Sequence, residues 1–198
     1  MAHIHQIAVL TSGHSRGSNL QAINDYFFAH QLPVQIAFAV KTKADAPVSE
    51  VCRQNRITCI YLPCNDMKQF ERNVLTLIRE YRIELIALAG FLKLLSPGFL
   101  EQAGIPVLNI HPALLPKYGG KGMFGMAVHQ AVWTAKERYS GVTIHLVDPV
   151  YDHGKILAQL KVDISKCGSA EDVARSVLKI EHSLYGKTIW EYLSSLQP

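Results

Sequence analysis

Short apolar runs of strand length alternate with amphipathic stretches through the first half of the chain. The apolar runs lie at 7–10, 34–40, 58–62 and 85–88. The stretches with apolar residues at helical spacing lie after Ser18, at 46–55 and at 68–82. Strands that alternate with helices predict an α/β fold, with a doubly wound, mostly parallel sheet and right-handed crossovers.

A fifth strand is predicted at 107–111, and it ends because Pro112 cannot donate the next hydrogen bond of a sheet. A glycine-rich loop follows at 114–122, which indicates mobility. A short helix is expected at 127–136. The regular alternation of strand and helix therefore gives way here to a longer connection.

Two further strands with alternating side chains are predicted at 141–147 and 156–164, joined by a turn at 149–154. We expect them to pair antiparallel, as an addition to the edge of the sheet. The last helix is expected to begin at Ser169, a favourable N-cap residue followed by acidic residues in the first turn. Because no repeat or linker interrupts the pattern, residues 1–198 are expected to form a single domain.

Asn109 and His111 stand two residues apart on the fifth predicted strand. Side chains alternate between the faces of a strand, so both are expected on one side, with Ile110 turned towards the core. Ligands of open α/β sheets collect at the carboxyl ends of the strands, which makes this amide and imidazole candidates for chemistry. The alternative is a structural pair that caps the following loop.

The segment 11–19 is a glycine-containing loop between the first strand and the first helix. Such a loop directs backbone N–H groups and a helix amino terminus towards one point, which suits a phosphate, and Arg16 adds positive charge. It matches neither the GxGxxG nor the Walker pattern, so a dinucleotide is not indicated. The alternative is that Ser18 serves only as the N-cap of the helix.

Composition narrows the class of protein. With 48% hydrophobic and 18% charged residues, the chain has the balance of a globular protein. The formal charge of +4 comes from scattered Lys and Arg residues, so no nucleic-acid partner is expected. The most apolar window, 83–95, is short and contains Glu84 and Lys93, so no membrane span is expected.

The cysteines have neither the paired spacing nor the histidine partners of a zinc site, and no metal is expected. They are Cys52, Cys59, Cys64 and Cys167. Free thiols favour a reducing, cytoplasmic setting.

Four groups of residues occur in a defined order along the chain. They are Ser12-Gly13 through Gly17-Ser18-Asn19-Leu20-Gln21-Ala22, Leu88-Ala89-Gly90-Phe91, Asn109-Ile110-His111-Pro112 with Leu114-Leu115-Pro116, and Asp152-His153-Gly154. Their order and spacing resemble those of the phosphoribosylglycinamide (GAR) formyltransferases, folate-dependent enzymes of the formyltransferase superfamily. The resemblance runs from about residue 7 into the last helix. It implies a Rossmann-like formyltransferase fold and transfer of the formyl group of 10-formyltetrahydrofolate to the amine of GAR, in de novo purine biosynthesis.

The resemblance implies that Asn109, His111 and Asp152 form the catalytic set. His111 is expected to be the acid and oxyanion stabiliser, with Asn109 as the second donor, because amide N–H and imidazolium groups stabilise a developing oxyanion. Asp152 is expected to raise the pKa of His111 and to help the amine proton leave. The alternative for Asp152 is a turn residue. His145, on the strand that leads to Asp152, either orients it or is a core histidine.

Binding residues follow from the same resemblance. Gly17, Ser18 and Asn19 match the segment for the phosphate and ribose of GAR. Glu181 matches a glutamate near the ribose hydroxyls, against the alternative of an exposed helix glutamate. A flat heterocycle held by backbone groups needs shape rather than particular side chains. The residues expected at the folate are Lys68, Leu92, Lys93, Leu94, Leu95, Asn109, Asp148, Pro149, Val150, Tyr151 and Asp152.

Other functions remain open at this stage. A formyltetrahydrofolate deformylase, a hydrolase, would use water in place of the amine on the same residues, with an additional regulatory domain that is not expected here. Methionyl-tRNA formyltransferase would bring a further C-terminal domain and stronger basic character. A non-catalytic phosphate-binding module is the third alternative. The expected partners are the small molecules GAR and reduced folate, in a monomer or homodimer.

Overall fold

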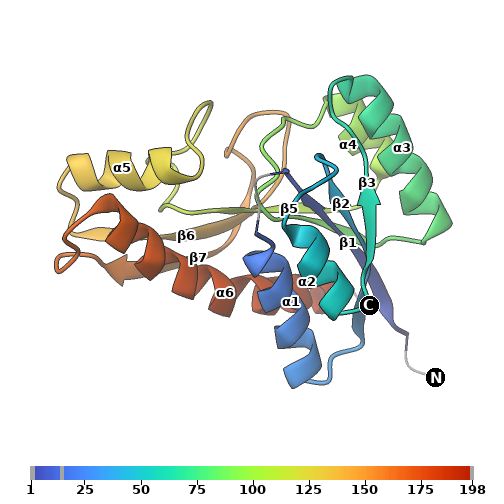
Figure 1. The fold of residues 1–198 in the computed structure, drawn as a ribbon, viewed down its shortest axis with the longest axis horizontal. Coiled ribbons are helices and arrows are strands. Elements are labelled where there is room, and N and C mark those ends of the chain that lie inside the picture. Colours follow the sequence, from blue (N-terminus) through green and yellow to red (C-terminus); the bar gives the residue numbers. More distant parts are fainter. Residues whose placement is uncertain (1–2, 14–15, 197–198) are drawn as a thin grey trace.

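A computed structural model describes residues 3–13 and 16–196 (Figure 1). In this part of the chain, one sheet contains the strands β1 (His5–Thr11), β2 (Val34–Lys41), β3 (Thr58–Tyr61), β4 (Leu85–Leu88), β5 (Val107–His111), β6 (Tyr139–Leu146) and β7 (Ile156–Asp163). The helices are α1 (Ser18–Ala29), α2 (Val48–Gln54), α3 (Met67–Glu80), α4 (Pro97–Ala103), α5 (Met126–Thr134) and α6 (Ala170–Ser195).

The strands lie in the order β3-β2-β1-β4-β5-β6-β7. The neighbours from β3 to β5 pair in parallel, whereas β6 and β7 each pair antiparallel with the strand before them. The predicted doubly wound sheet with an antiparallel addition at its edge is therefore confirmed. The chain winds to one side of β1 and then returns to its other side with β4, which makes the carboxyl ends of these strands the expected place for a ligand.

Helices cover both faces of the sheet, as Figure 1 shows. Side chains of β1 alternate between the two faces. Ile7 and Val9 pack in a core that includes residues of α1, α2 and α6, while Ala8 and Leu10 pack in a second core with residues of α3 and α4. This burial on both faces explains why the central strands read as nearly continuous apolar runs.

The helix α6 is 26 residues long and packs against α1 and the sheet. It begins after Ser169, whose hydroxyl oxygen accepts a hydrogen bond from the N–H of Asp172 at 3.2 Å, so the predicted N-cap is confirmed. Gly186 permits close approach of the two helices, because a Cβ there would lie 2.7 Å from Cβ of Tyr26. Among the helices of residues 3–13 and 16–196, none has the length and apolar character needed to cross a membrane.

The helix α4 is absent from the predicted elements. Ser96 is its N-cap, with a hydroxyl oxygen 3.1 Å from the N–H of Phe99, and Pro97 occupies the first helical position. Glu71 of α3 accepts hydrogen bonds from both the N–H and the hydroxyl of Ser96, each at 2.7 Å. A helix of seven residues is too short for apolar periodicity to show, so its capping residues were the available signal.

One interpretation of the loop before α1 made Ser18 the N-cap of the helix, and the structure differs from it. Gly17 occupies the N-cap position with φ of 83°, in the left-handed region that glycine tolerates. Ser18 is the first helical residue, and Gly17, which has no side chain, offers no side-chain acceptor to the first turn. Ser18 is therefore not the N-cap. His14 and Ser15 of the preceding loop lie outside the described residues.

Candidate active site

A cavity of about 490 Å³ opens at the carboxyl ends of β4 and β5. Its walls come from Asn19 in α1, the segment 88–95, the end of β5, the loop 120–125 and the loop 147–152. The long helix α6 and the start of α5 complete it. The cavity thus lies beside the place where the strand order reverses, as expected for an open α/β sheet.

Asn109 and His111 both face this cavity from β5. Ile110 between them packs in the core that contains α1 and α6, although part of it also reaches the cavity wall. The strand ends at His111, directly before Pro112, as predicted. The alternation of side chains along β5 therefore places the amide and the imidazole side by side.

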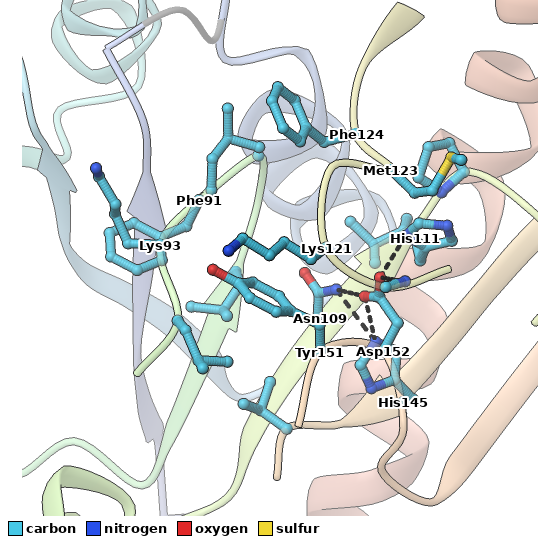
Figure 2. Close-up of a pocket in the computed structure, with 18 of the residues that line it drawn as sticks. Phe91, Lys93, Asn109, His111, Lys121, Met123, Phe124, His145, Tyr151 and Asp152 are labelled. Atoms are coloured by element: carbon cyan, nitrogen blue, oxygen red, sulfur yellow. Dashed lines mark hydrogen bonds and ion pairs between the residues drawn. The ribbon is translucent and has the colours of Figure 1, made fainter. Parts of the chain in front are cut away.

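Asp152 reaches the same point from the loop between β6 and β7. Its backbone has φ of 54°, a left-handed conformation that Asp adopts more readily than most residues. Oδ2 lies 3.5 Å from Nδ1 of His111, and Oδ1 lies 3.4 Å from Nδ2 of Asn109 (Figure 2). The N–H of Gly120 donates a hydrogen bond to Oδ2 at 2.9 Å. The structure therefore brings the three predicted catalytic side chains together.

His111 is 4% exposed, and its two ring nitrogens have different surroundings. Nε2 lies 2.8 Å from the carbonyl oxygen of Tyr118. A carbonyl only accepts, so the neutral ring carries its proton on Nε2, and a second proton enters at Nδ1, beside Asp152. Burial lowers the pKa of His111 below its ordinary value, although the negative charge of Asp152 acts to raise it. The expected effect of Asp152 is thus present but outweighed by burial.

His145 is the cross-strand neighbour of Asn109 in the pairing of β5 with β6. Its Nδ1 lies 2.9 Å from the carbonyl oxygen of Leu146 and donates to it, so the neutral ring presents Nε2 as an acceptor. Nδ2 of Asn109 lies 3.1 Å from that Nε2. The amide therefore directs its N–H groups towards His145 and Asp152 (Figure 2). Nε2 of His145 also lies 3.6 Å from Oδ1 of Asp152. This histidine therefore contacts both Asn109 and Asp152.

The environment of Asp152 favours its charged form. Burial acts to raise the pKa of this carboxyl group, but its contacts with His145 and His111 and the hydrogen bond from the N–H of Gly120 together lower it. A charged carboxylate thus lies next to a neutral imidazole near pH 7. Such a pair can take up a proton at Nδ1 of His111 and stabilise the resulting imidazolium.

Asn19 and Glu181 form a second polar pair in the cavity wall. Nδ2 of Asn19 donates to Oε2 of Glu181 at 2.7 Å. Glu181 is only 9% exposed, so its interpretation as an exposed helix residue is wrong. Burial raises the pKa of its carboxyl group, although the hydrogen bond from Asn19 acts to lower it. Oδ1 of Asn19 is buried and finds no hydrogen-bond partner among the described residues.

Most of the residues expected at the folate line the cavity. Leu92, Leu94, Val150 and Tyr151 are all more than a third exposed although their side chains are large and apolar. Lys93, Leu95 and Asp148 also line it. The cavity lining does not include Gly17, Ser18, Lys68 or Pro149.

The lining also contains residues that are absent from the predicted site, and four of them have large side chains outside the predicted segments. Lys121, Met123 and Phe124 belong to the loop before α5, and His129 belongs to α5 itself. Figure 2 shows the three loop side chains beside the cavity. Apolar residues inside a glycine-rich loop were the signal for Met123 and Phe124, because such loops are otherwise polar. His129 sits in a helix pattern that gives no comparable signal.

Comparisons with known proteins show the family of this chain. The family model described as formyl transferase matches residues 5–189. Phosphoribosylglycinamide formyltransferase of Haemophilus influenzae is 34% identical over 91% of this chain and 83% of its own length. The chloroplastic phosphoribosylglycinamide formyltransferase of Arabidopsis thaliana is 35% identical over 93% of this chain. The chain spans 64% of the length of that plant relative and 59% of the one from Vigna unguiculata.

Solved structures show the same relationship. Glycinamide ribonucleotide transformylase 1 from Symbiobacterium toebii superposes with a TM-score of 0.87, at 26% identity, over 98% of this chain and 90% of that one. Phosphoribosylglycinamide formyltransferase from Bacillus halodurans superposes with a TM-score of 0.86, at 29% identity, over 97% of each chain. The chain therefore belongs to the formyl transferase family and is similar, within it, to the phosphoribosylglycinamide formyltransferases.

Proposed function

We propose that the protein transfers the formyl group of 10-formyltetrahydrofolate to the amine of GAR, giving formylglycinamide ribonucleotide and tetrahydrofolate in purine biosynthesis. The observation that carries this proposal is the meeting of Asn109, His111 and Asp152 at one cavity of a formyl transferase chain. Its relatives named phosphoribosylglycinamide formyltransferase, from plants and bacteria, support the choice of GAR as the acceptor.

The proposed reaction combines a change of bonds at the formyl carbon, the movement of protons and the stabilisation of charge on the formyl oxygen. The amine nitrogen of GAR forms a bond to the formyl carbon, and the bond from that carbon to N10 of the folate breaks. One amine proton leaves, and one proton reaches N10. Between these events, negative charge develops on the formyl oxygen, and donors placed at that oxygen lower the barrier.

His111 and Asn109 are the proposed donors to the developing oxyanion. In the free protein, both N–H groups of Asn109 are directed at His145 and Asp152, and Nε2 of His111 is directed at the carbonyl of Tyr118. Catalytic hydrogen bonds often form only once substrate is bound. We therefore expect substrate binding to exchange these internal partners for the formyl oxygen.

Asp152 is the proposed stabiliser of the charged imidazole and acceptor of the amine proton, directly or through a water. Its charged carboxylate lies beside Nδ1, the nitrogen of His111 that receives the second proton. His145 is proposed as a positioning residue, since it contacts both Asn109 and Asp152. The proton from the amine thus has a charged acceptor within the site.

The proposed GAR site lies between α1 and α6. Asn19 and Glu181 provide oxygen atoms suited to ribose hydroxyls, and the unpartnered Oδ1 of Asn19 supports a ligand that donates a hydrogen bond there. Gly17 and Ser18 at the start of α1 are proposed for the phosphate, because a helix amino terminus favours an anion. Arg16 is exposed in the same loop and supplies a cation.

The proposed folate site lies between two segments with exposed apolar side chains. Leu92 and Leu94 stand on one segment, and Val150 and Tyr151 on the other. A largely apolar cleft with a few polar backbone groups suits a flat heterocycle. Lys68 lies outside the lining, and we propose it only as a contact for the charged tail of the folate.

A formyl-transfer assay with and without GAR tests the proposal. Purified protein is mixed with 10-formyltetrahydrofolate, and tetrahydrofolate formation is followed. Turnover that requires GAR is the expected result. Turnover of equal rate without GAR would instead identify a deformylase, and no turnover in either mixture would identify a non-catalytic module. No feature of the site favours either alternative.

The setting of the protein is proposed in the same way. We infer that the chain works as a single domain, as a monomer or homodimer, on small molecules. All four cysteines are free thiols, which supports a cytoplasmic setting, while its plant relatives are named as chloroplastic.

A further inference from the structure

The amino-terminal end of the sheet carries a group of ligand atoms far from the cavity. His3 precedes β1, His5 is its first residue, and Glu84 directly precedes β4. Because β1 and β4 are parallel neighbours, their amino ends lie side by side. The cavity opens at the other, carboxyl, ends of the strands. This group therefore lies at the opposite end of the sheet from the cavity.

The possible ligand atoms of these three residues lie close together. Nε2 of His3 lies 3.0 Å from Oε1 of Glu84, and Nδ1 of His5 lies 2.7 Å from Oε2. One ligand atom from each of the three residues can be chosen so that all lie within 4.8 Å of one another. Ligand atoms about 2.0–2.2 Å from a tetrahedral zinc ion lie roughly 3.3–3.5 Å apart. Small side-chain adjustments therefore suffice to admit an ion.

The surroundings hold two of the three ligands in place. The side chain of His5 is 6% exposed, and its ring packs edge-on against Trp190 with the ring centroids 6.4 Å apart. The N–H of Gln6 donates to Oε1 of Glu84 at 3.1 Å. Such supporting contacts orient metal ligands. His3 has a side chain that is 63% exposed, which leaves a path from solvent to the group.

The charge of the group also suits a cation. Glu84 accepts hydrogen bonds from His3, His5 and the backbone N–H of Gln6. A glutamate carboxylate is charged at neutral pH. Two imidazoles and one carboxylate form a donor set that zinc and related divalent transition metals accept.

We propose that His3, His5 and Glu84 form a site for a divalent transition-metal ion of the zinc type. The ion joins the beginning of β1 to the beginning of β4, two segments about 80 residues apart in sequence. Three protein ligands leave a fourth position for water. An ion that binds only the folded chain raises the stability of the folded state. The bound ion should therefore stabilise the sheet. The ion replaces the two direct histidine–carboxylate contacts.

Isothermal titration of the full chain, without a polyhistidine tag, with ZnCl₂ tests the proposal. Saturable binding of a single zinc ion per chain is expected, with a rise in melting temperature. His3→Ala and Glu84→Gln should each weaken binding at least about tenfold, since each removes a ligand. His30→Ala is the matched control, because His30 is an exposed histidine whose ring contacts the carbonyl of Tyr26 in its own helix. It should leave zinc binding unchanged.

Two results would overturn the proposal. The first is no saturable binding up to about 1 mM zinc. The second is unchanged affinity in both His3→Ala and Glu84→Gln, which would place the ion elsewhere. His3 is exposed, so His3→Ala should fold even if Glu84→Gln does not, and it then decides alone. A second readout is the broadening of histidine ring signals in NMR by Co²⁺, which should affect His3 and His5 before His111.

Discussion

At the scale of single residues, Asp152 is the group on which the proposed chemistry depends most. Asp152→Asn removes the negative charge beside Nδ1 of His111. We expect kcat to fall by about 10²–10⁴-fold, the usual contribution of a positioned acid–base group, while folate binding changes little. The pKa of His111, already lowered by burial, should fall further, because the charge of Asp152 acts to raise it.

Steady-state kinetics, folate titration and NMR titration of the His111 ring measure these three effects. Asp163→Asn is a suitable control, since Asp163 is an exposed carboxylate outside the cavity lining and is paired with Arg138 at 3.3 Å. Unchanged kcat in Asp152→Asn would remove Asp152 from the mechanism. A rise in the pKa of His111 would contradict the electrostatic argument.

Asn109 has a structural and a proposed catalytic task. Asn109→Ala removes a donor to the oxyanion, and removal of one such donor costs about 10²–10³-fold in kcat. It also leaves Nε2 of His145 without the amide that now lies 3.1 Å away. Single-turnover kinetics separate the two tasks, because a lost donor lowers the chemical step rather than substrate binding. A loss below tenfold would show that Asn109 is structural.

His129, a residue of the cavity lining, should make the stability of the protein depend on pH. It is 7% exposed, and burial followed by the charge of His111 lowers its pKa from 6.5 to about 4. The unfolded chain therefore takes up a proton below about pH 6.5, whereas the folded chain does so only near pH 4. The free energy of unfolding should fall as the pH drops through this interval, by an amount on the order of 3 kcal/mol from this residue.

Urea denaturation at several pH values between 4 and 6.5 checks this expectation. His129→Gln cannot take up the proton, so its stability should fall less steeply with acid than that of the native chain. His30→Gln, at an exposed position, should keep the native pH dependence. Identical slopes for the native chain and His129→Gln would contradict the assignment.

At the scale of elements, the loop before α5 is the part of the site most suited to movement. Lys121, Gly122, Phe124 and Gly125 are exposed, and Gly120 contributes an N–H to Asp152 at 2.9 Å. The loop thus touches the proposed catalytic carboxylate but has little burial of its own. Regions with few buried contacts open at low free-energy cost.

We expect this loop to become ordered when GAR and folate bind together. Trypsin cleavage after Lys121 should slow several-fold in the presence of both ligands, because a closed loop is a poor protease substrate. Cleavage after Lys166, in the loop between β7 and α6 and outside the cavity lining, is an internal control and should not change. Equal protection of both sites would indicate general stabilisation rather than closure.

The helix α6 shows how one element combines core and site. Its buried positions Val173, Val177, Glu181, Tyr185 and Ile189 recur every four residues. Glu181 thus stands within an otherwise largely apolar stripe, at the cavity wall. Its place in this four-residue spacing was by itself a signal in the sequence that Glu181 is buried.

At the scale of the whole molecule, Tyr185 ties α6 to the strands that carry the site. Its side chain is fully buried, and its hydroxyl lies 3.0 Å from the carbonyl of Leu88 and 2.9 Å from that of Leu108. Tyr185→Phe leaves these buried carbonyls without that donor. We expect a loss of about 1–3 kcal/mol in the free energy of unfolding, measured by urea denaturation.

Tyr61→Phe is the matched control, because Tyr61 is 46% exposed at the edge strand β3. It should change the free energy of unfolding by less than Tyr185→Phe. If Tyr185→Phe is no more destabilising than this control, the hydroxyl does not hold the helix to the sheet.

The sequence predicted the strands and most helices because the pattern of each is local. The apolar residues of β4 and the capping Ser169 of α6 act within a few residues of themselves, so neighbouring positions reveal them. The helix α4 was not predicted because it is short. The orientation of the Asn109 amide was not predicted because His145, which directs it, lies on another strand. Resemblance to a family supplied the link between Asp152 and His111 that periodicity cannot contain.

The sequence by itself determined the order of the strands along the chain, that Asn109 and His111 share a face, and that strands alternate with helices through most of the chain. Only the tertiary structure decided that the loop of Asp152 reaches Nδ1 of His111, that Gly120 contacts the same carboxylate, and that burial keeps the imidazole neutral. The reason is physical. Local conformation depends on neighbouring residues, whereas distance, burial and electric field at the site depend on segments that meet only when the sheet is assembled.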